Sequence, residues 1–168
     1  MSFEQIKPAQ IELCPFATFD KGWALVTAGT EDHLNTMTVS WGSMGTLWQK
    51  PAATVYIRQS RYTKEFVDAQ GYFSVSFLPE EYRKQLGYLG SASGRDEDKV
   101  AKAGLTPIML DETPAFEEAS LVLVCQKAYA GLLAPENFID PKVDASLYPD
   151  QDYHTMYVGY VDKAFRKA

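Results

Sequence analysis

The sequence is poor in the residues and motifs on which many enzyme classes depend. It has two cysteines and two histidines among 168 residues, and they lie far apart. This dispersal argues against a catalytic zinc site, and we expect Cys14 and Cys125 to be small buried side chains in a reducing compartment. The chain contains no G-x-G-x-x-G, no P-loop and no G-x-S-x-G motif. A Rossmann domain, a P-loop NTPase and a serine hydrolase are therefore not indicated.

Positive charge and long apolar runs are also scarce. Sixteen Lys and Arg face 22 Asp and Glu, which gives a net charge of -6. An acidic chain is a poor candidate for binding nucleic acid or an anionic membrane surface. No apolar run approaches membrane-spanning length, and the N-terminus lacks a basic-then-apolar signal pattern. We therefore expect a cytoplasmic protein, with residues 1–168 forming one domain.

The hydrophobic pattern predicts many short strands and a few short helices. Strands are expected at 23–27, 35–41, 53–58, 72–78, 121–127 and 153–161, and helices at 62–69, 79–89 and 96–103. Residues 42–51 are expected to be a loop, and residues 131–152 a long excursion of the kind that serves function or covers an interface. This order predicts a mainly β protein with short helices, built as an antiparallel, Greek-key-like barrel.

The most informative segment is the expected strand Asn35–Trp41, in which apolar and hydroxyl side chains alternate strictly. Alternation places Met37, Val39 and Trp41 on one face and Thr36, Thr38 and Ser40 on the other. A row of short hydroxyls suits a flat polar ligand that needs several hydrogen-bonding groups along one edge. The alternative is an ordinary solvated strand face.

A second candidate site lies where the expected strand 53–58 gives way to the helix at 62–69. Unpaired N–H groups and the positive end of the helix dipole favour an anion there. Ser60 and Thr63 add hydroxyl donors, and Arg58 and Arg61 add positive charge. The segment is therefore a candidate phosphate seat, with plain helix capping by Ser60 or Thr63 as the alternative.

His154 is the remaining titratable candidate, inside the last expected strand between Tyr153 and Thr155. A lone histidine in a strand is usually a hydrogen-bonded structural residue. A functional role for His154 is expected only if it borders a ligand.

Taken in order, four segments resemble the flavin reductase-like family of FMN-binding split barrels, which includes flavoredoxins and the reductase partners of two-component monooxygenases. The segments are Asn35–Trp41, Arg58–Thr63 with its helix and Gly71–Val75, Ser93–Lys99 with Gly104-Leu105, and Tyr153-His154 with Tyr157–Gly159. Two features depart from the family pattern. Tyr160 stands where an acidic residue is usual, and the 131–152 excursion is longer than in the simplest members, which bears on substrate access.

The resemblance implies a homodimer that holds FMN along the hydroxyl-bearing strand, with the phosphate near Ser60, Tyr62 and Thr63. It places Lys99 close to the cofactor or the dimer contact, and His154 near the flavin ring. With the residue-based candidates, the predicted cofactor-binding set is Asn35, Thr36, Met37, Thr38, Ser40, Trp41, Arg58, Ser60, Arg61, Tyr62, Thr63 and Lys99, and the predicted catalytic residue is His154.

The activity implied is NAD(P)H-dependent reduction of flavin or another small acceptor, with a monooxygenase or other redox protein as a potential partner. Such an enzyme needs no protein nucleophile, because FMN carries the electron chemistry. Two alternatives remain open, namely an FMN-binding electron-transfer module that is not itself an enzyme, and a split barrel that has lost its cofactor.

Overall fold

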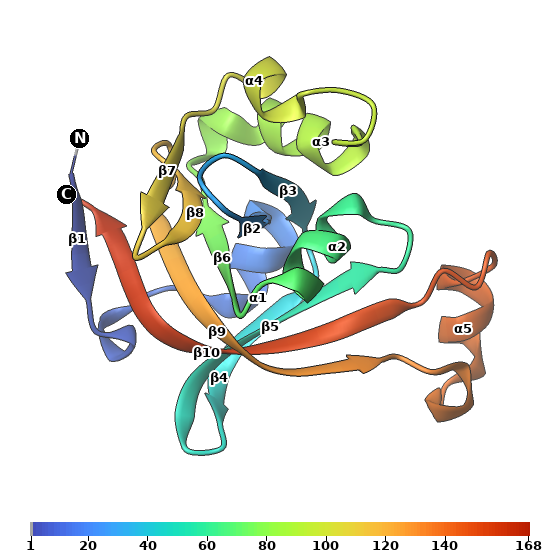
Figure 1. Ribbon diagram of the computed structural model, residues 1–168. Coiled ribbons are helices and arrows are strands. Elements are labelled where there is room, and N and C mark those ends of the chain that lie inside the picture. Colours follow the sequence, from blue (N-terminus) through green and yellow to red (C-terminus); the bar gives the residue numbers. More distant parts are fainter. Residues whose placement is uncertain (1) are drawn as a thin grey trace.

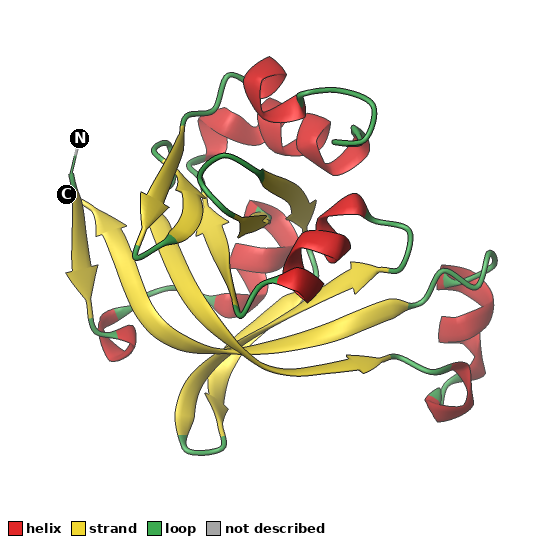
Figure 2. Ribbon diagram, viewed as in Figure 1, coloured by secondary structure: helices red, strands yellow, loops and turns green. Residues whose placement is uncertain are grey.

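The computed structural model describes residues 2–168 and is built around one eight-stranded antiparallel sheet (Figures 1 and 2). Along the sheet the strands follow the order β3-β2-β6-β9-β10-β5-β4, and β1 pairs with β10. Two further strands, β7 and β8, form a separate hairpin. The strands are β1 (Phe3–Ile6), β2 (Ala24–Gly29), β3 (Leu34–Val39), β4 (Gly42–Leu47), β5 (Lys50–Arg58), β6 (Tyr72–Phe77), β7 (Pro107–Leu110), β8 (Thr113–Phe116), β9 (Leu121–Leu132) and β10 (His154–Lys167).

Short helices cover the ends and one side of this sheet (Figure 2). They are the short turns η1 (Pro8–Gln10), η2 (Thr18–Gly22), η3 (Glu80–Tyr82) and η4 (Pro135–Asn137), and the helices α1 (Pro15–Ala17), α2 (Tyr62–Ala69), α3 (Arg83–Ser91), α4 (Lys99–Ala103) and α5 (Pro141–Leu147). The prediction of a mainly β protein with short helices is confirmed. Among residues 2–168, no helix is both long enough and apolar enough to cross a membrane.

Two apolar clusters hold the elements together. The larger fills the inside of the curved sheet, with Val26, Val55 and Tyr157 among its buried members. The smaller lies between the outer face of the sheet and α3, where Leu86 and Leu89 are almost fully buried. Each buried aliphatic side chain contributes roughly 1.5–3 kcal/mol to folding. The α3 side of the sheet is therefore packed rather than open to solvent.

The helix predicted at 62–69 forms as α2 with the same bounds, and each predicted strand appears with ends shifted by a few residues or more. The loop predicted at 42–51 is wrong, because most of it forms β4 and the start of β5. A two-residue turn joins these strands at Trp48 and Gln49, both at positive φ. Such turns usually carry Asn-Gly or Asp-Gly, so this sequence gives no hairpin signal. Strand β1 and the β7–β8 hairpin were also not predicted.

The strands β9 and β10 run well beyond the predicted ends and carry α5 at their far end (Figure 1). They stay paired as far as Leu132 and Thr155. Residues 133–153 then connect them and contain η4 and α5. The predicted excursion is therefore a folded unit between two long paired strands, and we call residues 133–153 the excursion from here on.

The two cysteines differ in their surroundings. Cys125 is fully buried, and burial raises the pKa of its thiol, as expected for a small core side chain. Cys14 is exposed, so the prediction that both are buried is wrong. Within residues 2–168, no group of three or more His, Cys, Asp or Glu side chains is placed to hold a metal ion.

Candidate functional site

The hydroxyl row predicted along β3 is divided, because Thr36 turns into the protein while Thr38 and Ser40 border a cavity. Thr36 is fully buried, and its hydroxyl lies 2.8 Å from that of Thr27 on β2. Thr38 donates a 2.6 Å hydrogen bond to the Leu86 carbonyl oxygen of α3. Because α3 and β2 use these hydroxyls, Thr36 cannot reach a ligand.

The end of β3 nevertheless borders a cavity of about 220 Å³, formed where β3, β5 and β10 meet the segment before α2. Seven of the thirteen predicted site residues line it, together with Val39 and Tyr56, which were not predicted. The seven are Met37, Thr38, Ser40, Trp41, Arg58, Arg61 and His154. We call this space the β3–β10 cavity. Ser40, which lines this cavity, is an exposed residue just beyond β3.

His154 enters the β3–β10 cavity as the first residue of β10. Its strand partner is Arg58 of β5. The rings of His154 and Trp41 lie 4.8 Å apart between centroids. Burial, together with repulsion from Arg58 and Arg61, lowers the pKa of His154 to about 4, although Asp152 acts in the opposite direction. The imidazole is therefore neutral near pH 7.

The predicted anion-binding site at Ser60 is occupied by a carboxylate of the protein itself. The Ser60 backbone N–H donates to one carboxylate oxygen of Asp152 at 3.0 Å, and its hydroxyl donates to the other at 2.6 Å. The Arg58 guanidinium donates to the carbonyl oxygens of Asp152 and Leu147, both at 3.0 Å. In this structure the segment therefore binds a carboxylate of the excursion, and its binding of a phosphate stays a prediction.

Thr63 and Asn35 form a buried pair rather than a ligand contact. The Asn35 amide donates a 2.9 Å hydrogen bond to the Thr63 hydroxyl, which joins α2 to β3. Both residues are buried. The side chain of Thr63 therefore stabilises the packing of α2, which has no side-chain cap hydrogen bond, and a contact between Thr63 and a phosphate stays a prediction.

Arg61 is the cation best placed to receive a ligand in the β3–β10 cavity. One of its guanidinium nitrogens donates to the Gly90 carbonyl oxygen at 2.8 Å, at the end of α3. That contact fixes the side chain while leaving the remaining guanidinium N–H groups for a ligand. Arg61 is half-buried, so an ion pair there is less screened than on an open surface.

Lys99 lies beneath the end of α3 and not in the β3–β10 cavity. Its ammonium group donates to the carbonyl oxygens of Leu89 and Ala92, at 3.2 and 3.0 Å. Burial, together with repulsion from Arg61, lowers the pKa of Lys99 to about 8. These contacts satisfy the last carbonyls of α3.

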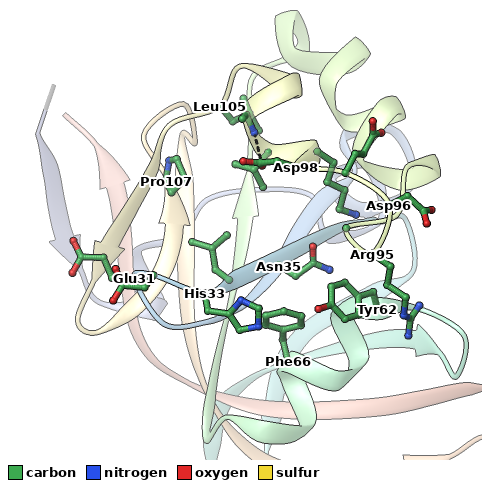
Figure 3. A pocket seen from close by; sticks show the side chains of 17 residues that line it. Glu31, His33, Asn35, Tyr62, Phe66, Arg95, Asp96, Asp98, Leu105 and Pro107 are labelled. Carbon is green, nitrogen blue, oxygen red and sulfur yellow. Dashed lines mark hydrogen bonds between the residues drawn. The ribbon is translucent and has the colours of Figure 1, made fainter.

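A second cavity, of about 720 Å³, lies between α2, α4 and the start of β3 (Figure 3). It contains three of the predicted site residues, Asn35, Tyr62 and Lys99. The Arg95 guanidinium lies 4.7 Å from the centre of the Tyr62 ring. Five acidic residues also line this cavity: Glu31, Asp32, Asp96, Glu97 and Asp98. That charge disfavours a phosphate here. Ten of the thirteen predicted residues are thus divided between two cavities of unlike chemistry, and Thr36, Ser60 and Thr63 line neither.

An apolar groove of about 810 Å³ adjoins the β3–β10 cavity and shares Ser40, Trp41 and Tyr56 with it. Its walls come from α1 and η2, from β4, and from the excursion. The remaining lining residues are Pro15, Phe16, Phe19, Asp20, Gly42, Ser43, Met44, Leu133, Phe138, Val143, Leu147, Tyr148 and Met156. Asp20 is the single charged residue among them.

The donor set of the β3–β10 cavity fits part of a flavin mononucleotide. Arg58 and Arg61 suit an anion, Ser40 offers a hydroxyl, and the rings of Trp41 and His154 offer flat surfaces. Sites for molecules of drug size usually span roughly 300–1,000 Å³, so 220 Å³ is too small alone. The adjoining apolar groove supplies the space that the aromatic ring system would need.

Sequence reasoning missed the contributions of Tyr56 and Tyr148. Tyr56 was read only as part of a strand, although alternation along 53–58 could have placed it on the same side as Arg58. Tyr148 stands in the excursion, and its hydroxyl contacts His154. No local pattern predicts a contact between a loop and a strand that begins six residues later.

Comparison with known proteins identifies the type of domain. The profile described as "Flavin reductase like domain" matches residues 16–165. The FMN-binding domain of a flavin reductase-like enzyme from Shewanella baltica superposes with a TM-score of 0.70 at 18% identity, covering 98% of this chain and 77% of that one. Flavoredoxin from Methanosarcina acetivorans gives 0.68 at 22% identity, covering 87% and 68%.

A third solved structure, the NADH:FAD oxidoreductase of Streptomyces globisporus, gives a TM-score of 0.65 at 18% identity, with 87% of this chain and 75% of that one covered. No curated protein matches the chain significantly. The structural neighbours share the split-barrel fold, which confirms the fold predicted from the resemblance. On the profile match over most of its length, the chain belongs to the flavin reductase-like domain family.

Proposed function

We propose that the protein is an FMN-binding oxidoreductase that reduces flavin or another small acceptor at the expense of NAD(P)H. The observation that carries the proposal is the β3–β10 cavity, where Arg61, Ser40 and the Trp41–His154 ring pair converge beside an apolar groove. Family membership supports the cofactor class. The electron donor is inferred from the family alone.

In this proposal the chain's own residues bind and orient, because bound FMN would supply the hydride and electron chemistry. Arg61 would pair with the anionic part of the cofactor. Trp41 and His154 would border its ring system, and Ser40 would donate or accept a hydrogen bond at its edge. The apolar groove would exclude water and admit a small acceptor of low polarity.

We further propose FMN rather than FAD as the resident cofactor. The cations that line the β3–β10 cavity, Arg58 and Arg61, stand together, and the sequence has no glycine-rich pyrophosphate motif. Heat release of the flavin, followed by mass identification, tests this directly. Recovery of FAD from protein that was offered both flavins would overturn it.

A homodimer and a cytoplasmic location are also part of the proposal. Several large apolar side chains stand exposed, among them Phe16, Trp41 and Leu147 around the apolar groove, and Trp48 on the β4–β5 hairpin. Exposed apolar patches are typical of surfaces that bind another protein. A monooxygenase or other redox protein remains a candidate second partner.

Two spectra test the central proposal. Purified protein offered FMN and then freed of excess should retain the absorbance of oxidised flavin. Anaerobic addition of NADH or NADPH should then bleach that absorbance. Retained flavin without bleaching would instead indicate an electron-transfer module, and failure to retain any flavin would indicate a split barrel without a cofactor.

A further inference from the structure

Tyr148 links the excursion to His154 inside the protein. It is the C-cap residue that directly follows α5, and only 4% of its surface is exposed. Its hydroxyl oxygen lies 2.8 Å from Nδ1 of His154 in a buried hydrogen bond. Because His154 also lines the β3–β10 cavity, Tyr148 touches that cavity through another residue.

The Tyr148 ring is held from several sides. The Arg58 guanidinium lies 5.1 Å from its centre, and the Tyr153 ring stacks at 4.9 Å. Phe138 packs at 5.6 Å, and Arg58 binds the carbonyl oxygen of the preceding Leu147. These contacts fix the position of the Tyr148 hydroxyl, so it acts on His154 from a set direction.

The hydrogen bond between Tyr148 and His154 determines which nitrogen of His154 carries the ring proton. Burial raises the pKa of Tyr148, so its hydroxyl is protonated near pH 7, when His154 is neutral. Within residues 2–168, the Tyr148 hydroxyl makes one hydrogen bond, and its partner is Nδ1 of His154. A buried O–H group needs an acceptor. Nδ1 must therefore be that acceptor, and the ring proton must reside on Nε2.

We propose that Tyr148 is a positioning residue that holds His154 in the Nε2–H tautomer, so that His154 presents a neutral hydrogen-bond donor to the ligand of the β3–β10 cavity. The inference rests on the proposed function for the identity of that ligand. Through Tyr148, the excursion would set the kind of chemical group that His154 recognises. The group facing Nε2 is a hydrogen-bond acceptor, such as a carbonyl oxygen or an unprotonated ring nitrogen of a flavin.

The groups around His154 agree with a neutral donor. Arg58 of β5 and Arg61 before α2 oppose a positive charge on the ring, and Asp152 of the excursion favours one but is bound to Ser60. Tyr148 completes the set from the end of α5. A donor aimed at a flavin acceptor stabilises the electron-rich reduced form more than the oxidised form.

The first experiment needs no cofactor. Nitrogen-15 spectra of the flavin-free protein report which imidazole nitrogen carries the proton, and the assignment is simple because the chain has two histidines and His33→Gln removes the other signal. Wild type should show His154 with a protonated Nε2 and a hydrogen-bonded Nδ1. In Tyr148→Phe, the Nδ1 signal should lose its hydrogen-bonded shift, and the pKa of His154 should rise.

Tyr153→Phe is the matched control. It removes a hydroxyl from the same stacked pair, but that hydroxyl binds Asp144 and not His154. Its His154 signals should match wild type. A proton on Nδ1 in wild type, or His154 signals in Tyr148→Phe that equal those of wild type, would overturn the proposal. Because the protein is flavin-free, these outcomes are independent of whether the proposed function is right.

The second experiment uses FMN in both redox states. Losing one neutral hydrogen bond of about 1 kcal/mol corresponds to roughly a fivefold change. The ratio of affinities for reduced and oxidised FMN should therefore fall by up to about fivefold in Tyr148→Phe and stay constant in Tyr153→Phe. An unchanged ratio in Tyr148→Phe would mean that His154 does not donate to the flavin. Failure of every variant and of wild type to bind FMN would count against the proposed function instead.

Discussion

At the scale of single residues, Arg61 is the side chain that we expect to matter most for binding an anionic cofactor. A charge-assisted hydrogen bond is worth roughly 1.5–3 kcal/mol. Arg61→Ala should therefore raise the dissociation constant for FMN by about tenfold to one hundredfold. Fluorescence titration measures this. Arg166→Ala, an exposed arginine of β10, is the control for loss of one positive charge and should bind FMN normally.

Thr63 should behave in the opposite way, because its hydroxyl serves the fold. Thr63→Val leaves the buried amide of Asn35 without its partner. An unsatisfied buried donor costs about 1–3 kcal/mol, so thermal unfolding of the flavin-free protein should occur at a lower temperature. FMN affinity should change little in the remaining folded protein. A large loss of affinity with unchanged stability would instead place the phosphate at Thr63.

The ionisation of Lys99 should make the free energy of unfolding depend on pH in the alkaline range. Its pKa in the folded protein is about 8, below the usual value of 10.5. Between these values the unfolded chain binds more protons than the folded one, so the free energy of unfolding should rise with pH from about 8 to 10.5. At about 1.4 kcal/mol per pKa unit, the rise in the free energy of unfolding from Lys99 is at most about 3 kcal/mol.

Urea unfolding at several pH values measures that slope. Lys99→Met should show a smaller rise across this range than wild type, while Lys102→Met, which removes an exposed lysine of the same helix, should keep it. Equal slopes in wild type and Lys99→Met would show that the ammonium group is not destabilised by burial.

Sequence patterns predicted the position of the site better than the contacts that each of its residues makes. Seven predicted residues line one cavity, because strand ends and the start of a helix are readable from pattern and capping chemistry. The hydrogen-bond partners of Thr36, Ser60 and Lys99 could not be predicted from the sequence. Each is satisfied by a group from β2, the excursion or α3, and such choices depend on tertiary packing.

At the scale of elements, Asp152 is expected to hold the excursion against the end of β5. Asp152→Asn weakens the two hydrogen bonds to Ser60 by removing their charge. A loss of about 1.4 kcal/mol gives tenfold faster local opening. Hydrogen exchange of residues 147–153 should therefore accelerate about tenfold, with the β9–β10 pairing next to the barrel unaffected.

Asp150→Asn is the matched control, since Asp150 is an exposed carboxylate two residues away. It should exchange like wild type. Equal exchange in wild type and Asp152→Asn would mean that Arg58 alone secures the excursion through its backbone contacts.

Pattern reasoning at the element scale succeeded where residues alternate and failed where the turn is unusual. The helix α2 and the six predicted strands follow periodicity that local sequence displays. The β4–β5 hairpin turns on Trp48 and Gln49, which seldom adopt positive φ. Strand β1 is four residues long and is stabilised by its pairing with β10, so its sequence alone carries little signal.

At the scale of the whole molecule, we expect two chains to associate. Light scattering at micromolar concentration should report about twice the chain mass of 18.8 kDa. The physical reason is the exposure of large apolar side chains, with Phe16 87% exposed and Trp48 53% exposed. A chain that remains monomeric in the presence of FMN would contradict the proposed dimer.

The pairing of β9 with β10 up to Leu132 and Thr155 brings the two ends of the excursion close together. An insertion between such ends costs the barrel mainly the entropy of closing a loop, which grows by about 0.6 kcal/mol for each doubling of length. Grafting a different segment between the same two strands would therefore reshape the apolar groove and remove the contact of Tyr148 with His154, while preserving the barrel.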